Sequence, residues 1–220
     1  MTPFLLVLSS PSGGGKSTIA RQLLQGREDL AYSVSATTRA PRPGEVDGVA
    51  YHFLAAAEFD RRVAAGAFLE WAEYAGHRYG TLRSEVERIL AGGRHAVLDI
   101  EVEGARQVRA RFPAAVQVFI LPPSGDVLVE RLRQRGTEGP EALRRRLEQA
   151  AEELAAALDY DYTVVNDDLV LAVEQVAAII DAETRRTRRQ RDLAARLLDL
   201  RRDVLHAAAQ FGGTVTLPKE

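Results

Sequence analysis

Short hydrophobic runs alternate with longer amphipathic stretches along most of the chain. The runs of strand length are Phe4–Leu8, Tyr32–Ala36, His95–Ile100, Val116–Leu121 and Tyr162–Val165. The stretches with a helical period are Ser17–Gln25, Glu58–Ala65, Leu82–Ala91, Val102–Arg111, Gly125–Arg135, Glu141–Leu158 and a long one that begins near Leu169. Such alternation is typical of βαβ units, so we predict an α/β fold with a mostly parallel sheet flanked by helices.

Two segments break the alternation. From Arg39 to Tyr79 the chain has turn-forming residues, then short strands at Tyr51–Phe53 and Phe68–Tyr74 with a helix between them, which predicts a small α/β insertion. The polar stretch Arg135–Pro140 (RGTEGP) connects two arginine-rich helices and has the composition of a mobile lid.

Composition narrows the class of protein. The 220 residues are 46% hydrophobic and 27% charged, as in an ordinary globular domain. The absence of cysteine excludes disulfides, thiolate zinc sites and a cysteine nucleophile. A net charge of -2 gives no overall attraction to nucleic acid, so we do not expect nucleic acid as a partner. Phe4–Leu8 is too short to span a membrane and lacks the flanks of a signal peptide, so we expect a cytoplasmic protein with no membrane contact.

The segment Leu8–Thr18 (LSSPSGGGKST) follows a strand pattern and precedes a helical one, which is the context of a phosphate-binding loop. Three successive glycines allow backbone N–H groups to turn toward a phosphate. Lys16 is expected to bridge the β- and γ-phosphates, and the Ser17 hydroxyl to bind Mg²⁺. The loop departs from the usual pattern at Ser10, where glycine is expected.

A second metal-binding group is predicted at the end of the strand His95–Ile100. Asp99 lies where an acidic residue of a phosphate-loop protein holds Mg²⁺ through a water molecule.

A second anion site is predicted in the insertion. Arg39 and Arg42 flank Pro41 in a rigid turn, so their guanidinium groups can converge on one phosphate monoester. Ser35 and the phenols of Tyr51 and Tyr79 can add neutral donors.

These motifs resemble those of the guanylate kinase family in order and in sequence. The matching segments are the phosphate loop, Ser33–Phe53, Glu70–Tyr74, Arg78–Thr81, Leu98–Ala105 (LDIEVEGA), Arg135–Glu138 (RGTE) and Val165–Asp168 (VNDD), within about residues 3 to 183. The resemblance implies transfer of the γ-phosphoryl group of ATP to GMP, and to dGMP, with Mg²⁺. It also implies a core at 1–36, 82–134 and 157–183, a GMP-binding region at 37–81 and a lid at 135–156.

The resemblance assigns the guanine-reading role to Glu70, with Thr81 near the O6 and N7 edge and Glu101 as a second acidic contact. Guanine presents N1–H and a 2-amino group side by side, and one carboxylate can accept from both, whereas adenine would leave that carboxylate unpaired. Glu101 stands where the family typically has Asp, and Glu103 where it has Gln.

On the donor side, the resemblance places ATP against the loop residues Ser12, Gly13, Gly14, Gly15, Lys16, Ser17 and Thr18, with Asn166 contacting adenine. Arg135 and Arg146 are the arginines implied to close onto the ATP phosphates, and the predicted catalytic set is Lys16, Arg135, Arg146 and Asp99. The acceptor is an already ionised phosphate oxygen, so we expect no general base.

Two other interpretations remain for the site: a ribose bisphosphate kinase of the same fold, and a non-catalytic guanylate-kinase-like module that binds phosphopeptides. Glu70 and Thr81 argue against the first, and the intact Gly13–Ser17 run against the second.

The tail, residues 184–220, extends past the family pattern. It combines the basic run Thr184–Arg191 with an apolar stripe at Leu193, Leu197, Leu200 and Val204. A helix that packs on its own domain or on another subunit, giving a homo-oligomer, is the first interpretation; a basic patch for nucleic acid is the second.

Overall fold

The structure is a computed structural model that describes residues 1–74, 76–134 and 140–210. The chain divides into two compact units, Pro3–Ile180 and a second one made of Met1–Thr2 with Asp181–Glu220. The candidate site residues all belong to the first unit, which is therefore described first.

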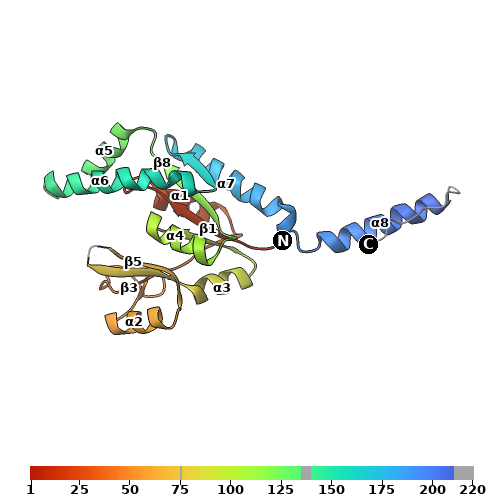
Figure 1. Cartoon of the computed structure of the whole chain (residues 1–220), viewed down its shortest axis with the longest axis horizontal. Helices are drawn as coiled ribbons and strands as arrows, with labels where there is room; N and C mark the ends of the chain where they lie inside the picture. The colour runs from red at the N-terminus through yellow and green to blue at the C-terminus, as the bar shows by residue number, and fades with distance from the viewer. Residues whose placement is uncertain (75, 135–139, 211–220) are drawn as a thin grey trace. The chain divides into compact units, whose positions relative to one another are not determined.

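A five-stranded parallel sheet forms the centre of the first unit (Figure 1). Its strands lie in the order β2 (Leu30–Tyr32), β7 (His95–Asp99), β1 (Leu5–Ser9), β8 (Val116–Leu121) and β9 (Tyr162–Val165). Every pair of neighbours in this sheet is parallel, which confirms the predicted fold class. The carboxyl ends of the strands therefore share one edge, where ligands of such sheets bind.

Helices cover both faces of this sheet. Leu6 and Leu8 of β1 pack in a cluster with α1 (Lys16–Gly26) and α7 (Leu169–Arg185). Leu5 and Val7 point the other way, into a cluster with α3 (Arg83–Ala91) and α4 (Val102–Arg111). Because β1 is buried on both faces, its continuous hydrophobic run is what a central parallel strand requires.

The insertion forms a second sheet. Its order is β4 (His52–Phe53), β3 (Ala36–Thr37), β6 (His77–Leu82) and β5 (Phe68–Tyr74), and α2 (Ala56–Ala64) packs on it through the stacked rings of Phe59 and Phe68 (Figure 1). We did not predict β6 because its sequence is largely polar and contains Gly80. A Cβ at Gly80 would lie 2.8 Å from the Glu70 carbonyl oxygen, so the glycine allows close pairing with β5.

The predicted strand Tyr32–Ala36 is wrong as one element. The structure has β2 ending at Tyr32 and β3 beginning at Ala36, in different sheets. Ser33 N–H donates to Val97 of the core sheet, whereas the Ser35 carbonyl accepts from His52 of the second sheet. The residues between the two strands carry the chain from one sheet to the other.

An α-helical pair stands beside the carboxyl edge of the core sheet. It consists of α5 (Gly125–Gln134) and α6 (Pro140–Ala155), which packs against α5 through Leu128, Leu132 and Ala150 and continues as a 3₁₀ turn, η1 (Ala156–Asp159). Most of the predicted lid connection, 135–139, lies outside the described residues.

The second unit contains the end of α7, the 3₁₀ turn η2 (Thr187–Arg189) and α8 (Leu193–Gln210). Glu183 pairs with Arg186 at 2.9 Å and with Arg189 at 3.3 Å, and Thr2 N–H donates to the Arg189 carbonyl. The helix α8 has no buried residue. Within the described ranges, no helix is both long enough and apolar enough to cross a bilayer.

Candidate functional site

The loop between β1 and α1 has the conformation that its glycines allow. Gly15, the residue before α1, has φ of 95°, a left-handed conformation that disfavours a side chain. Gly14 N–H donates to the Pro11 carbonyl over 2.9 Å, closing the turn. Ser10, the departure from the usual pattern, is buried, and its hydroxyl also donates to the Pro11 carbonyl.

Asn166 braces this loop from the end of β9. Its Nδ2 donates to the Gly14 carbonyl over 2.9 Å, and a Cβ at Gly15 would lie 2.2 Å from that nitrogen. Asn166 therefore fixes the loop conformation.

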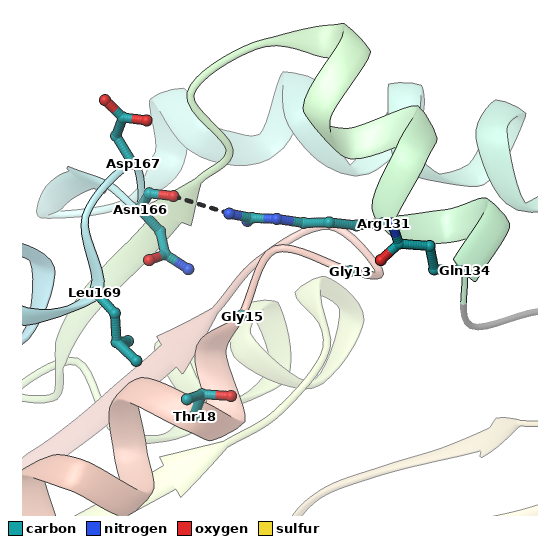
Figure 2. A pocket seen from close by; sticks show the side chains of 8 residues that line it. All are labelled: Gly13, Gly15, Thr18, Arg131, Gln134, Asn166, Asp167 and Leu169. Atoms are coloured by element: carbon teal, nitrogen blue, oxygen red, sulfur yellow. Dashed lines mark hydrogen bonds between the residues drawn. The ribbon is translucent and has the colours of Figure 1, made fainter.

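A pocket of about 320 Å³ opens beside this contact, between α5, the phosphate loop and the start of α7. Figure 2 shows the Arg131 side chain reaching from α5 over Gly13 toward Asn166, whose carbonyl accepts from Arg131 Nη2 at 3.2 Å. Arg131 Nη1 is buried without a hydrogen-bond partner among the described residues. The sequence does not distinguish Arg131 from the other arginines on either side of the predicted lid connection, because α-helical spacing alone does not show which one faces the loop.

Lys16 is held by two carboxylates. Its Nζ lies 2.8 Å from Glu101 Oε1 and 3.9 Å from Asp99 Oδ1. Burial alone lowers the pKa of Lys16, but Glu101 and Asp99 outweigh it and the pKa is raised. Lys16 is therefore a cation in place to meet a phosphate.

Ser17 and Asp99 fit a divalent cation. Asp99 accepts a hydrogen bond from the Ser17 side chain, and its Oδ1 is buried without a hydrogen-bond partner within the described part of the chain. A hydroxyl and a carboxylate are hard oxygen ligands of the kind that Mg²⁺ prefers, while its other ligands come from water and substrate phosphates. Burial raises the pKa of Asp99, and the charge of Lys16 opposes that rise.

A second pocket, of about 350 Å³, joins these residues to the insertion. Its lining includes most of the predicted acceptor residues, Ser35, Arg39, Arg42, Tyr51, Glu70, Tyr79 and Glu101, and three of the predicted donor residues, Lys16, Ser17 and Asp99. The phosphate loop and the arginine turn thus face the same cavity.

Glu45, which we did not single out from the sequence, organises the arginine turn. Its carboxylate accepts from Arg39 Nη2 at 2.8 and 3.0 Å and from the backbone N–H of Arg42 at 2.8 Å. The Arg39 hydrogen bond, followed by that from Arg42, lowers the pKa of Glu45. The sequence signal that could have identified Glu45 is its position in a predicted turn, three residues after Arg42.

Two tyrosines line the same wall. The rings of Tyr51 and Tyr79 meet edge to face at 5.9 Å, and the Arg39 guanidinium lies 5.5 Å from the Tyr51 centroid. Burial raises the pKa of Tyr51, so its phenol remains a hydrogen-bond donor at neutral pH.

Glu70 is the buried carboxylate of this pocket. It is 5% exposed, and its Oε1 accepts from the Thr81 hydroxyl at 2.6 Å across the β5–β6 pair. Burial raises the pKa of Glu70, and the hydrogen bonds from Thr81 act in the opposite direction. The other oxygen, Oε2, lies beside Gly104 of α4, which also lines the pocket.

The helix α6 contacts the phosphate loop at Ser12. Arg146 Nη2 lies 3.5 Å from Ser12 Oγ, and Glu153 Oε2 accepts from Ser12 N–H at 3.0 Å. Gln149, between them on the same helix face, donates to Glu153. Glu153 was missed because a glutamate among several on a helix has no local signature. Arg135, the other predicted lid arginine, lies outside the described residues.

The comparisons with known proteins agree on one family. The family model for guanylate kinase matches residues 3–183. The chain is 53% identical over 183 residues to a guanylate kinase of Symbiobacterium thermophilum (83% of this chain, 87% of that protein) and 56% identical over 179 residues to one of Gloeobacter violaceus (81% and 87%). The crystal structure of guanylate kinase from Anaplasma phagocytophilum is 35% identical with a TM-score of 0.71, covering 88% of this chain and 93% of that one.

Proposed function

This chain belongs to the guanylate kinase family, and we propose that it transfers the γ-phosphoryl group of ATP to the phosphate of GMP, giving ADP and GDP, at the pocket that Lys16 shares with the arginine turn. The observation that carries the proposal is that Lys16, Arg39 and Glu70 line one cavity. This reaction needs three groups in one place: a cation for the donor phosphates, a cation for the acceptor phosphate and a carboxylate that recognises the base.

GMP occupies the insertion side of the cavity in this proposal. Its phosphate binds Arg39 and Arg42, with Ser35, Tyr51 and Tyr79 as neutral donors. Glu70 accepts from guanine N1–H and the 2-amino group, and Thr81 lies near the O6 and N7 edge. Glu101, which contacts Lys16, is the second acidic contact of the acceptor.

ATP occupies the core side. The adenine lies in the pocket beside Asn166, where Arg131 offers a flat guanidinium face, and the phosphates bind the backbone of Ser12–Thr18 and Lys16. Arg146 approaches the phosphates from α6 and neutralises charge on the transferred group, and Arg135 remains a prediction from the sequence for the same role.

Ser17 directly, and Asp99 through water, would hold Mg²⁺, and the ion would supply positive charge to offset that of the substrate phosphates. The acceptor oxygen is already ionised at neutral pH, so the residues of this site need to orient the two nucleotides in line and to exclude water, not to remove a proton.

The decisive test is a coupled ADP-release assay with ATP and each of GMP, dGMP, AMP, CMP and UMP. We expect turnover with GMP and dGMP, and rates lower by several powers of ten with AMP, because a buried carboxylate facing adenine N1 is left unpaired. Equal rates with AMP and GMP would contradict the assignment of Glu70.

Beyond the nucleotides, cytoplasmic location and assembly through the C-terminal helix remain predictions from the sequence. Fractionation of cells that express the tagged full chain would test the first. Light scattering of the full chain would test the second.

A further inference from the structure

The helix α4 supports the strand that carries Glu70. β5 lies at the edge of the second sheet, so only one side of the β5 backbone pairs with another strand, β6. On the other side lies α4, and it presents Gly104, Gln107 and Arg111, which share one helix face because they are three and four residues apart.

Gln107 pairs with the backbone of β5 on one side of Glu70. Its Oε1 accepts from Trp71 N–H at 3.2 Å, and its Nε2 donates to the Trp71 carbonyl at 3.0 Å. One side-chain amide thus satisfies both outward backbone groups of Trp71, as a neighbouring strand would.

Arg111 holds the backbone on the other side of Glu70. Its Nη1 donates to the Leu69 carbonyl at 2.8 Å. The strand register shifts between Phe68 and Glu70, and such a bulge re-aims side chains. Leu69 accordingly packs in the core cluster with α3 and α4, while Glu70 lines the acceptor pocket.

Gly104 leaves the space that the carboxylate of Glu70 fills. A Cβ at this position would lie 2.7 Å from Glu70 Oε2, closer than side chains tolerate. Burial raises the pKa of Glu70, and the nearby charge of Arg111 opposes that rise, which favours the ionised form that can accept two hydrogen bonds.

We propose that Gln107 and Arg111 are positioning residues for acceptor specificity: by fixing the backbone of Leu69 and Trp71, they hold Glu70 in register with the guanine edge. The inference rests on the proposed role of Glu70 as the guanine reader. Two parallel hydrogen bonds to one carboxylate require close alignment of Glu70 with the guanine edge. If β5 were held only by β6, the strand could shift and Glu70 would lose that alignment.

The test uses Gln107→Met in the full chain, because methionine keeps the length of the side chain and removes both hydrogen bonds. The matched control is Arg106→Met, an exposed neighbour on α4 for which no contact with β5 is described. Dissociation constants for GMP, IMP and ATP are measured by calorimetry, and kcat and KM by ADP release. IMP lacks the 2-amino group, so the ratio of the GMP and IMP constants reports the Glu70 contact.

We expect Gln107→Met to weaken GMP binding about tenfold, IMP binding less and ATP binding not at all, so that the GMP-to-IMP preference narrows. The control should match the unaltered chain. An unchanged preference, or equal losses for all three nucleotides, would overturn the inference, since the second result indicates a general structural role.

Glu70→Gln, measured in parallel, separates this inference from the proposed function. If Glu70→Gln narrows the preference and Gln107→Met does not, only the positioning role fails. If neither does, the guanine-reading role of Glu70 fails as well. If Gln107→Met does not fold, Gln107→Glu replaces it in the test. This variant keeps the acceptor for Trp71 N–H and loses the donor to the Trp71 carbonyl, so the GMP-to-IMP preference should narrow by a smaller amount. An unchanged preference would again overturn the inference.

Discussion

Glu70 combines two opposed requirements in one side chain. Recognition of guanine needs an ionised carboxylate that accepts two hydrogen bonds, but the same group is buried between β5, β6 and α4. Burial raises its pKa, so the ionised form makes the folded chain less stable than a neutral side chain of the same shape would. This is the cost in stability that a binding site commonly carries.

A stability prediction follows for Glu70→Gln. An acid whose folded pKa is raised stabilises the fold fully below its unfolded pKa and loses that contribution as the pH rises through the folded value. The glutamine variant should therefore unfold at higher denaturant concentration than the unaltered chain at pH 8, and the gain should vanish below the ordinary carboxyl value of 4.5. Glu73→Gln, which removes an exposed carboxylate from the same strand, is the control and should leave the denaturation midpoint at pH 8 unchanged. A Glu70→Gln variant that is less stable at pH 8 would contradict the prediction.

Lys16 gives a prediction on turnover. Lys16→Ala removes the cation proposed to bind the β- and γ-phosphates, so kcat should fall by at least about 10²-fold. In our proposal the acceptor phosphate binds the arginine turn instead, so the dissociation constant for GMP should change little. Steady-state kinetics and calorimetry with each nucleotide check both parts. A loss of GMP affinity as large as the loss of ATP affinity would show that the two phosphate sites are not separate.

At the scale of elements, the loop before α1 and the end of β9 form one unit through Gly15 and Asn166. Gly15→Ala forces a side chain into the left-handed region and into the Asn166 amide. Gly66→Ala is a matched control, since Gly66 has φ of 66° but a Cβ added there would meet nothing within 4 Å.

Both glycine variants should lose about 1–2 kcal/mol of stability from the left-handed backbone alone. Only Gly15→Ala should also raise the KM for ATP, because it displaces Asn166 and alters the turn that we propose binds the ATP phosphates. Denaturant unfolding and ADP-release kinetics measure the two effects. Equal KM values for ATP in the two variants would mean that the Asn166 contact has no part in ATP binding.

The elements that the sequence predicted well are those whose signals are local. The phosphate loop and the strand Val116–Leu121 each depend on consecutive residues, and the structure has the strand with those bounds. By contrast, Glu153 and Arg131 gain their contacts only when distant helices reach the loop, and no pattern within α5 or α6 marks them. The split between β2 and β3 was missed because Ser33 pairs with a strand more than sixty residues away.

At the scale of the whole molecule, the two compact units have different roles in our predictions. The residues that line both pockets lie within Pro3–Ile180, whereas α8 has no buried residue and exposes Leu197, Leu200 and Val204. A chain that ends at Asp192 should therefore keep kcat within about twofold. Light scattering should show a smaller particle than the full chain gives, if the helix joins subunits as its apolar stripe predicts. If the shortened and full chains have the same oligomeric state, the helix does not join subunits. A large loss of kcat would show that the helix contributes to the site.

In the proposed site, the 2.8 Å contact between Lys16 and Glu101 would couple the binding of the two nucleotides. An acceptor base that recruits Glu101 withdraws a counter-ion from the lysine and leaves it free for the donor, and a donor phosphate that captures the lysine releases the glutamate. By thermodynamic linkage, the factor by which ATP alters GMP affinity must equal the factor by which GMP alters ATP affinity. If Lys16 and Glu101 have the roles proposed for them, each nucleotide should therefore raise the affinity for the other by the same factor.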